Sequence, residues 1–252
     1  MLDLEIIGEG ATAKIYRDGD TAIKLYENAP PNEAENEAER QRFAYDAGLP
    51  VPAVYGVRHL NGGATALDMA YIDGKPLMWL DMDEAAAKNA IQTLVRLQRI
   101  VHHVRAAGFP KQADRLAGKI AHTQHLDEAA KSRMRAELSR LDDGADNLCH
   151  GDFHPLNILQ GGERHWIIDW VDATAGSPLA DACRTYLIFK QHMARSAGIY
   201  LRAFCREAGA QPADVLTWMP VIAAGRLDEN MDDRARAQLL EFIVGGETEN
   251  GG

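Results

Sequence analysis

The chain has 252 residues, a formal net charge of −10, 46% hydrophobic residues and 25% charged residues. This composition is typical of a globular protein with one large domain or two lobes. The negative charge gives no general attraction for nucleic acid or an anionic membrane surface, so we expect neither as a partner. The segment MLDLEIIGEG does not resemble a signal peptide, and no apolar run approaches the roughly 18 residues of a membrane span. Three scattered cysteines favour free thiols and a cytoplasmic location.

The first part of the sequence predicts β structure with one helix. Strands are expected at residues 2–7, 11–17 and 21–26, and Asp18-Gly19-Asp20 indicates a tight turn between the last two. A helix is expected at 32–48, with Asn32 as its cap and Gly48 at its end. Two further strands are expected at 53–59 and 64–72.

The rest of the sequence predicts mainly helices. They are expected at 83–107, 127–141, 179–194, 198–208, 212–227 and 232–244, with short strands and loops at 150–170. A β-rich beginning followed by a helical remainder predicts an α+β, two-lobed protein.

The segment HGDFHPLNIL, residues 150–159, carries the strongest chemical signal. Asn157 follows Asp152 by five residues, and Asp169 closes the apolar run WIID shortly afterwards. An aspartate at this spacing can orient a hydroxyl, while the asparagine and the second aspartate can supply oxygen ligands to Mg²⁺. The pattern therefore favours phosphoryl transfer.

Two features near the beginning agree with that chemistry. Gly8-Glu9-Gly10 lies between two expected strands, where backbone N–H groups can approach phosphates, although such a turn can also be an ordinary hairpin. Lys24 lies within the apolar strand AIKLY. A lysine on an edge strand can simply extend to solvent, so a nucleotide role requires an acidic partner from the helix that follows.

A metal-dependent hydrolase is the competing interpretation. His150, Asp152 and His154 could ligate zinc, with ligands recruited from the pairs His122/His125 or His102/His103. This interpretation leaves Asn157, Asp169 and Lys24 without a role.

The order of these motifs resembles the protein-kinase-like fold, and HGDFHPLNIL with IIDW resembles the aminoglycoside phosphotransferase family. The resemblance covers nearly the whole chain. It implies a small β-rich N-terminal lobe with one helix at residues 1–72, a hinge at about 69–74, and a larger, mostly helical C-terminal lobe at 73–252. It also implies a small-molecule kinase that uses ATP and Mg²⁺ and has a small-molecule hydroxyl as acceptor. A non-catalytic nucleotide-binding protein of the same fold remains an alternative.

The resemblance implies a role for each matching position. Asp152 would be the catalytic aspartate, supported by His150 and Asp181, and Asn157 and Asp169 would be the magnesium ligands. The nucleotide-binding residues would be Gly8, Gly10, Lys24 and Glu37, with Met69, Ala70, Tyr71 and Ile72 as the hinge; Glu33 is the alternative partner for Lys24.

Three departures separate the sequence from protein kinases. Ala13 stands where a third glycine would be, Asp169 is followed by Trp-Val, and the interval from Asp169 to Pro178 is too short for an activation loop. These departures favour a small-molecule acceptor over a protein.

The segment RLDENMDDR, residues 226–234, bears on the charge of that acceptor. It places four carboxylates at an expected break between two helices, which can be no more than a solvated junction with a helix cap. The resemblance to aminoglycoside kinases implies instead that Asp228 and Glu229 bind ammonium groups, so a cationic acceptor is expected.

Overall fold

The computed structural model describes residues 5–10, 13–27, 29–60, 62–78 and 82–245. The chain forms two compact units. The first comprises Met1–Leu80 and Pro155–Asp172, and the second comprises Asp81–His154 and Ala173–Gly252. The sequence did not indicate that residues 155–172 belong with the first unit. The lobe boundary at residue 72 stays a prediction.

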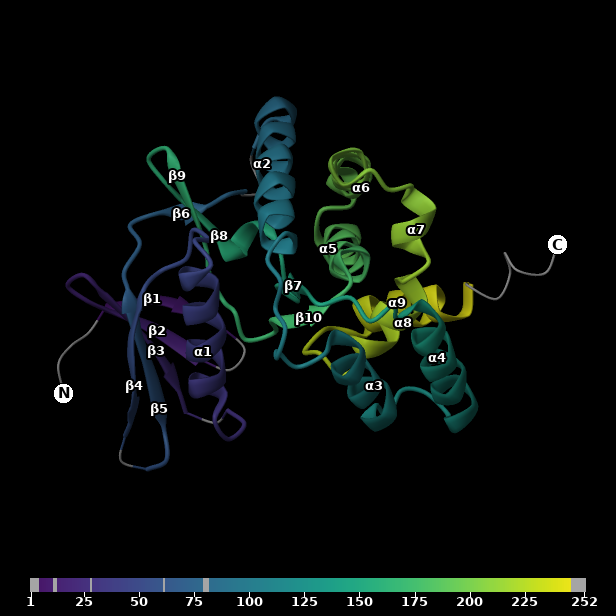
Figure 1. Ribbon diagram of the computed structural model, residues 1–252, viewed down its shortest axis with the longest axis horizontal. Coiled ribbons are helices and arrows are strands. Elements are labelled where there is room, and N and C mark those ends of the chain that lie inside the picture. Colours follow the sequence, from purple (N-terminus) through teal and green to yellow (C-terminus); the bar gives the residue numbers. More distant parts are fainter. Residues whose placement is uncertain (1–4, 11–12, 28, 61, 79–81, 246–252) are drawn as a thin grey trace. The chain divides into compact units, whose positions relative to one another are not determined.

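A five-stranded antiparallel sheet forms the main part of the first unit (Figure 1). Its strand order is β1-β2-β3-β5-β4, and the strands are β1 (Glu5–Glu9), β2 (Ala13–Asp18), β3 (Thr21–Tyr26), β4 (Val54–His59) and β5 (Thr65–Ala70). A smaller sheet follows the order β6-β8-β9, with β6 (Lys75–Pro76), β8 (Ile158–Gly161) and β9 (Arg164–Ile167).

Helix α1 (Glu33–Asp46) packs against β4 and β5. Its small buried residues Ala34 and Ala38 form a core with Tyr26 and Leu67 of the sheet. Asn32 occupies the cap position in a left-handed conformation with φ 62°, and its side chain makes no cap hydrogen bond, contrary to the expectation.

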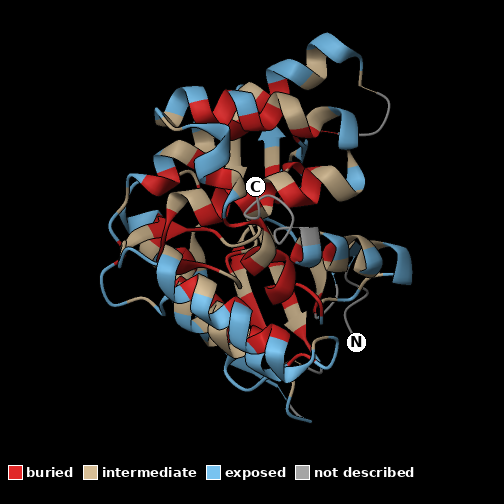
Figure 2. Ribbon diagram, turned by 90° about the vertical axis from the view of Figure 1, so that its right-hand side faces the viewer, coloured by how far each residue is buried: buried red, intermediate tan, exposed pale blue. Residues whose placement is uncertain are grey.

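The second unit is mostly helical. Its elements are α2 (Glu84–His102), α3 (Gln112–His122), α4 (Glu128–Leu141), β7 (Asn147–Cys149), β10 (Thr174–Gly176), α5 (Pro178–His192), α6 (Ala194–Ala208), α7 (Pro212–Leu216), α8 (Met219–Gly225) and α9 (Asp233–Gly245). Helices α2, α5 and α6 pack around Phe189, Tyr200 and Phe204, all fully buried. Figure 2 shows the helices with buried residues on one side and exposed residues on the other.

Two helix boundaries differ from the sequence expectation. Helix α2 ends at His102, five residues early. The helix expected at 212–227 is two helices, because Pro220 near the start of α8 lacks the N–H that would continue α7. Within the described part of the chain, no helix combines the length and apolar character needed to cross a membrane. The expected α+β class with a β-rich first part and a helical second part is confirmed.

Candidate active site

Lys24 on β3 is buried between two carboxylates of the first unit. Its Nζ lies 2.9 Å from Oε1 of Glu37 on α1 and 2.9 Å from Oδ1 of Asp169. The Tyr26 hydroxyl and the Trp170 backbone N–H also donate to the Glu37 carboxylate. Burial lowers the pKa of Lys24, but the two carboxylates outweigh this effect and raise the pKa above its ordinary value. The ammonium therefore stays charged, and Glu37 is the glutamate beside it.

Asn157 and Asp169 flank the hairpin of β8 and β9. Asn157 directly precedes β8, Asp169 follows β9 by two residues, and the Ile168 N–H donates to the Asn157 carbonyl at 3.0 Å. Asp169 has φ 66°, a left-handed conformation that aspartate tolerates better than most residues with a Cβ. From this conformation its carboxylate reaches Lys24. The hairpin thus brings Asn157, which carries an amide, close to Asp169, which carries a carboxylate.

The two glycines expected at the phosphate loop lie at the end of β1. Gly8 pairs with Ile15 of β2 beside a β-bulge, and the Gly10 N–H donates to the Ala13 carbonyl at 2.8 Å. Neither glycine has a positive φ, and residues 11–12 lie outside the described residues. The role of this turn in phosphate binding stays a prediction.

The expected hinge lies where β5 ends. Met69 and Ala70 are the last two residues of β5, and the N–H groups of Ala70 and Tyr71 donate to backbone carbonyls at 2.8 and 2.9 Å. Among the described residues, no backbone carbonyl accepts from the Ile72 N–H. Of these residues, Ile72 is therefore the best placed to offer a backbone donor to a base.

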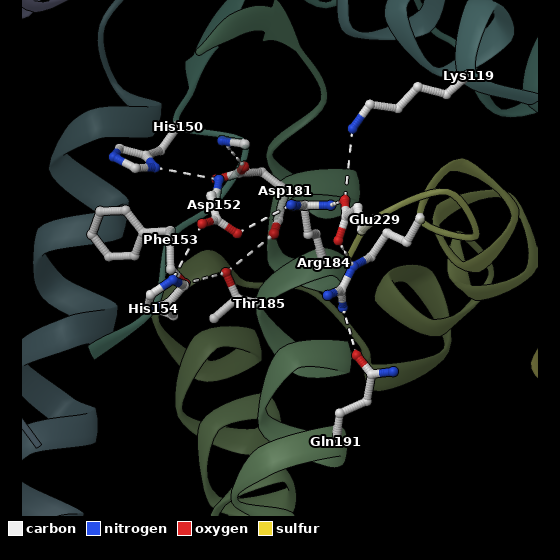
Figure 3. Close-up of polar contacts among 12 residues, drawn as sticks. Lys119, His150, Asp152, Phe153, His154, Asp181, Arg184, Thr185, Gln191 and Glu229 are labelled. Carbon is white, nitrogen blue, oxygen red and sulfur yellow. Dashed lines mark hydrogen bonds and ion pairs between the residues drawn. The ribbon is translucent and has the colours of Figure 1, made fainter. Parts of the chain in front are cut away.

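In the second unit, the loop that follows β7 is held by α5 (Figure 3). Gly151 has φ 83°, and its N–H donates to Oδ1 of Asp181 at 2.8 Å. The Asp152 N–H donates to Nδ1 of His150 at 3.3 Å, and the buried His150 ring packs edge-on against Phe153. A side chain at residue 151 would strain the left-handed backbone, so the glycine of HGD is required by the loop conformation.

The Asp152 carboxylate is held ionised by two neighbours. Its Oδ2 lies 3.2 Å from Nε2 of His154, and its Oδ1 accepts a hydrogen bond from Arg184 at 3.1 Å (Figure 3). Burial raises the pKa of Asp152, but the His154 hydrogen bond and the Arg184 charge outweigh it, so the pKa lies well below its usual range. The side chain is 28% exposed. It can therefore accept a hydrogen bond from a small molecule.

Asp181 joins this loop to three helices. Its Oδ2 accepts from Nε2 of His102 at 2.8 Å and from Gln98 at 3.2 Å, both on α2. The Tyr200 hydroxyl of α6 donates to Oε1 of Gln98 at 2.7 Å. Burial raises the pKa of Asp181. The hydrogen bonds from His102 and from the Gly151 N–H act in the opposite direction, and the pKa lies below its ordinary value. A buried, ionised aspartate thus fixes the backbone of residue 151.

Glu229 is surrounded by cations (Figure 3). Arg184 donates to its Oε1 at 2.6 Å, Arg226 donates to its Oε2 at 2.8 Å, and Lys119 Nζ lies 3.6 Å from Oε1. Burial raises the pKa of Glu229, but these three charges lower it to about 2. Asp228 instead accepts a hydrogen bond from the hydroxyl of Thr123, the residue that follows α3. The two residues expected to bind an ammonium group therefore have different surroundings, and the Glu229 carboxylate is already paired.

The geometry gives no support to a catalytic zinc site. Among the described residues, one group has three potential ligand atoms within 4.8 Å of one another, and it differs from the set expected for a hydrolase. Its members are His102, Cys149 and Asp181. All three are buried, and burial and the Asp181 charge raise the Cys149 pKa, which favours the thiol over the thiolate that metal binding requires.

A model of the phosphotransferase enzyme family matches residues 3–216. The chain belongs to the phosphotransferase enzyme family. This membership confirms the expected resemblance and the expectation of a small-molecule kinase. No curated protein sequence matches the chain significantly.

Solved structures of other phosphotransferases have the same fold. An apo thermostable mutant of aminoglycoside phosphotransferase APH(4)-Ia has a TM-score of 0.73 and 20% identity, covering 99% of this chain and 95% of that chain. A ternary complex of such a mutant with ADP and hygromycin B has a TM-score of 0.75 and 18% identity, covering 100% and 95%. A choline/ethanolamine kinase family protein from Mesorhizobium loti has a TM-score of 0.67 and 21% identity, covering 99% and 88%. At these identities the likeness establishes the fold.

Within this phosphotransferase, sequence reasoning missed the side chains that surround the loop. His102 was noticed only as a possible zinc ligand, and Gln98, Arg184 and Arg226 were not singled out. One signal was available: Arg184 lies three residues after Asp181 on the same helix, so the two side chains lie on the same face. Arg226 likewise lies three residues before Glu229, whereas the sequence offers no comparable signal for the approach of Lys119.

Proposed function

We propose that this phosphotransferase transfers the γ-phosphate of ATP, with Mg²⁺, to a hydroxyl group of a small molecule. The observation that carries the proposal is the buried Lys24, held charged between Glu37 and Asp169. Burying a lysine is costly, and a position fixed by two carboxylates suits a cation that must meet phosphates in one place. Neither a hydrolase nor a structural protein requires this arrangement.

Lys24 binds the phosphates in this proposal, and Gly8 and Gly10 approach them through the backbone. Residues 69–72 receive the base, with the Ile72 N–H as donor. Support for nucleotide binding comes from the related fold of APH(4)-Ia, which binds ADP and hygromycin B in a ternary complex.

Asn157 and Asp169 suit a magnesium ion by the chemistry of their donors. Both present oxygen atoms, the ligands that this hard cation prefers, and both lie at the ends of one hairpin whose backbone ties them together. When bound, Mg²⁺ neutralises charge on the phosphate oxygens. The Asp169 side chain is 41% exposed and keeps a second carboxylate oxygen beyond the one that contacts Lys24.

Asp152 orients the acceptor hydroxyl in this proposal. The hydroxyl oxygen forms a bond to the γ-phosphorus, the bond to the β–γ bridging oxygen breaks, and ADP leaves. The hydroxyl proton passes to Asp152. Because Arg184 and His154 keep the pKa of Asp152 low, this carboxylate is a weak base, so the proton moves late and Asp152 acts mainly by positioning.

The first test compares Asp152→Asn with Asp143→Asn, a change of the same kind at an exposed site. The acceptor is taken from a screen of hydroxyl compounds by ATP consumption. Asp152→Asn is expected to lower kcat by at least about 10²-fold, the scale of losing a positioned acid–base group. Binding of a non-hydrolysable ATP analogue with Mg²⁺, measured by calorimetry, is expected to stay unchanged in both variants. Wild-type turnover by Asp152→Asn would show that the assignment is wrong, and nucleotide binding without turnover on any acceptor would favour the non-catalytic alternative.

The charge of the acceptor is a separate question. The family resemblance favours a cationic acceptor bound by Asp228 and Glu229. Glu229 already contacts three cations, and the role of this pair in binding an ammonium group stays a prediction.

A further inference from the structure

One side of α5 contacts three successive residues of the loop at 150–154, which we call the HGD loop (Figure 3). The three contacts are the Gly151 N–H with Asp181 at 2.8 Å, Oδ1 of Asp152 with Arg184 at 3.1 Å, and the Phe153 carbonyl with the Thr185 hydroxyl at 2.8 Å. The helix residues are spaced i, i+3 and i+4, so they lie on one face of the helix. Helix α5 therefore holds both the backbone of the loop and the carboxylate of Asp152.

The contact of Arg184 acts directly on that carboxylate. The terminal torsion of an aspartate side chain is broad, so hydrogen bonds decide the direction of its oxygens more than a narrow rotamer does. Oδ1 of Asp152 accepts from Arg184, and Oδ2 lies 3.2 Å from Nε2 of His154. A guanidinium is planar and permanently charged, so its direction determines where a bonded carboxylate points.

The Arg184 guanidinium is in turn held by Glu229, which lies between α8 and α9. Its Nη1 donates to Glu229 at 2.6 Å while its Nη2 donates to Asp152, so one guanidinium joins two carboxylates. Glu229 also accepts from Arg226 at 2.8 Å, and Arg226 donates to Gln191 of α5 at 2.8 Å. The side chains of Arg184 and Arg226 are only 13% and 9% exposed. The position of Glu229 is therefore transmitted to Asp152 through Arg184.

We propose that Arg184 and Glu229 are positioning residues for phosphoryl transfer: Arg184 directs the Asp152 carboxylate towards the acceptor hydroxyl, and Glu229 acts through Arg184. This inference rests on the proposed function and adds two residues to it. It gives Glu229 a role other than binding an ammonium group. An acceptor contact acts on binding, whereas a positioning contact acts on the step in which the hydroxyl attacks. The low pKa of Asp152 agrees with this role, because a weak base contributes more by its direction than by its basicity.

The first measurement is a double-variant cycle in kcat, with the acceptor found in the screen of hydroxyl compounds. Arg184→Met is expected to lower kcat by about 10- to 100-fold, the scale of a misplaced catalytic group, and to change either KM by less than about 3-fold. Glu229→Gln is expected to lower kcat by at least about 3-fold. The double variant should have about the kcat of Arg184→Met alone, because Glu229 then has no guanidinium to act through.

The control is the surface ion pair of Glu137 and Arg140 on α4, changed in the same way. Arg140→Met, Glu137→Gln and their double variant should keep the wild-type kcat. Circular dichroism and binding of a non-hydrolysable ATP analogue check that every variant is folded. Arg184→Lys is the second variant, in case Arg184→Met does not fold. A lysine keeps the charge but lacks the planar fork that joins two carboxylates, so kcat is expected to be about 3- to 10-fold below wild type.

A second measurement needs no acceptor. The Asp152 carboxyl is titrated by NMR with isotope-labelled aspartate, and its signal is assigned by its absence in Asp152→Asn. The charged groups that face this carboxyl come from the HGD loop, from α5 and from the end of α8, and they are His150, His154, Arg184 and Arg226. In the wild type they keep the pKa of Asp152 below its usual range, so the carboxyl should stay ionised as far as the chain stays folded. In Arg184→Met it should take up its proton at a higher pH, because one of these charges is lost.

Two kinetic outcomes would overturn the inference. One is a wild-type kcat in Arg184→Met, or in Arg184→Lys where only that variant folds. The other is a double variant whose loss equals the product of the two single losses, which would show that Glu229 does not act through Arg184. An effect of Glu229→Gln on the acceptor KM alone would assign this residue to acceptor binding instead.

The titration separates failure of the inference from failure of the proposed function. An Asp152 titration that is the same in the wild type and in Arg184→Met would contradict the contact on which the inference depends. If the titration responds and the wild type turns over no acceptor, the contact stands, but the proposed function is wrong and the positioning role falls with it. If the wild type turns over an acceptor and Arg184→Met does so equally fast, the proposed function stands and only the positioning role is wrong.

Discussion

Lys24 shows how single residues combine stability and chemistry in this chain. It is 7% exposed, and its charge is held by Glu37 and Asp169, which come from a helix and from the end of a hairpin. Removing Lys24 would leave the buried Glu37 carboxylate without its cation, which costs more than the pair contributes. The same contacts that fix Lys24 therefore make the site sensitive to substitution.

Lys24→Ala is expected to raise the KM for ATP and lower kcat, because a fixed positive charge on the phosphates is lost. The expected combined loss in kcat/KM is at least about 10²-fold, the scale of a charge-assisted contact plus mispositioning. Lys14→Ala on the neighbouring strand, where the lysine side chain is 41% exposed, is the control and should change neither constant appreciably. Steady-state kinetics with varied ATP would measure both, and an unchanged KM and kcat in Lys24→Ala would contradict the assigned role.

At the scale of elements, α2, α5 and α6 hold the HGD loop through one buried polar network. His102 and Gln98 of α2 bond to Asp181 of α5, and Tyr200 of α6 bonds to Gln98. These three hydrogen bonds are buried, and the Gly151 N–H donates to the same Asp181 carboxylate, so the network ties helix packing to the backbone position of Gly151. We therefore expect His102 to act as a positioning residue for the loop through its contact with Asp181.

Adjacent histidines provide a matched test of that network. His102 is 2% exposed and contacts Asp181, whereas His103 is exposed on the same helix end. His102→Ala is expected to destabilise the fold by about 1–3 kcal/mol, the range for leaving a buried hydrogen-bonded group without its partner, and to lower kcat with little change in the KM for ATP. His103→Ala should do neither. Denaturant unfolding and kinetics separate the effects. If His102→Ala lost stability but kept full kcat at a temperature where it is folded, the network would be structural only.

At the scale of the whole molecule, the free energy of unfolding depends on carboxylates that are paired in the folded state. Glu229 has a folded-state pKa of about 2, below the ordinary value of 4.5. Its contribution to stability is therefore fully present above pH 4.5 and is lost as the pH falls towards 2. Over that window the contribution that disappears is about 2–3 kcal/mol.

Comparison of the wild type with Glu229→Gln across pH isolates this contribution. The wild type should be more stable than the variant at pH 6, and the difference should shrink between pH 4.5 and 2. Glu163→Gln, at an exposed turn between β8 and β9, should follow the wild type at every pH. Urea unfolding at each pH measures the differences. A difference between wild type and Glu229→Gln that stays constant down to pH 2 would exclude the ion pairs with Lys119, Arg184 and Arg226 as the cause.

The sequence by itself determined the features that depend on neighbours along the chain. Asp152, Asn157 and Asp169 lie within a segment of 18 residues. The β-rich part and the helical part of the chain follow from local periodicity. Local signals were less reliable at boundaries, since the end of α2 and the break between α7 and α8 depend on packing and on Pro220. Each of these features is set within a few turns of helix or one hairpin.

Only the tertiary structure decided which charges meet. The resemblance already favoured Glu37 over Glu33, but the contact of Glu37 with Lys24 depends on which face of α1 packs on the sheet. The environment of Glu229 depends on α3, on α5 and on the end of α8, which bring Lys119, Arg184 and Arg226 together. A run of four carboxylates in sequence suggests a site for cations, but in the structure Glu229 is already paired with three basic side chains. Sequence spacing records the charges of near neighbours, whereas the electrostatic potential at a site is the sum over every charge that folding brings within a few ångströms.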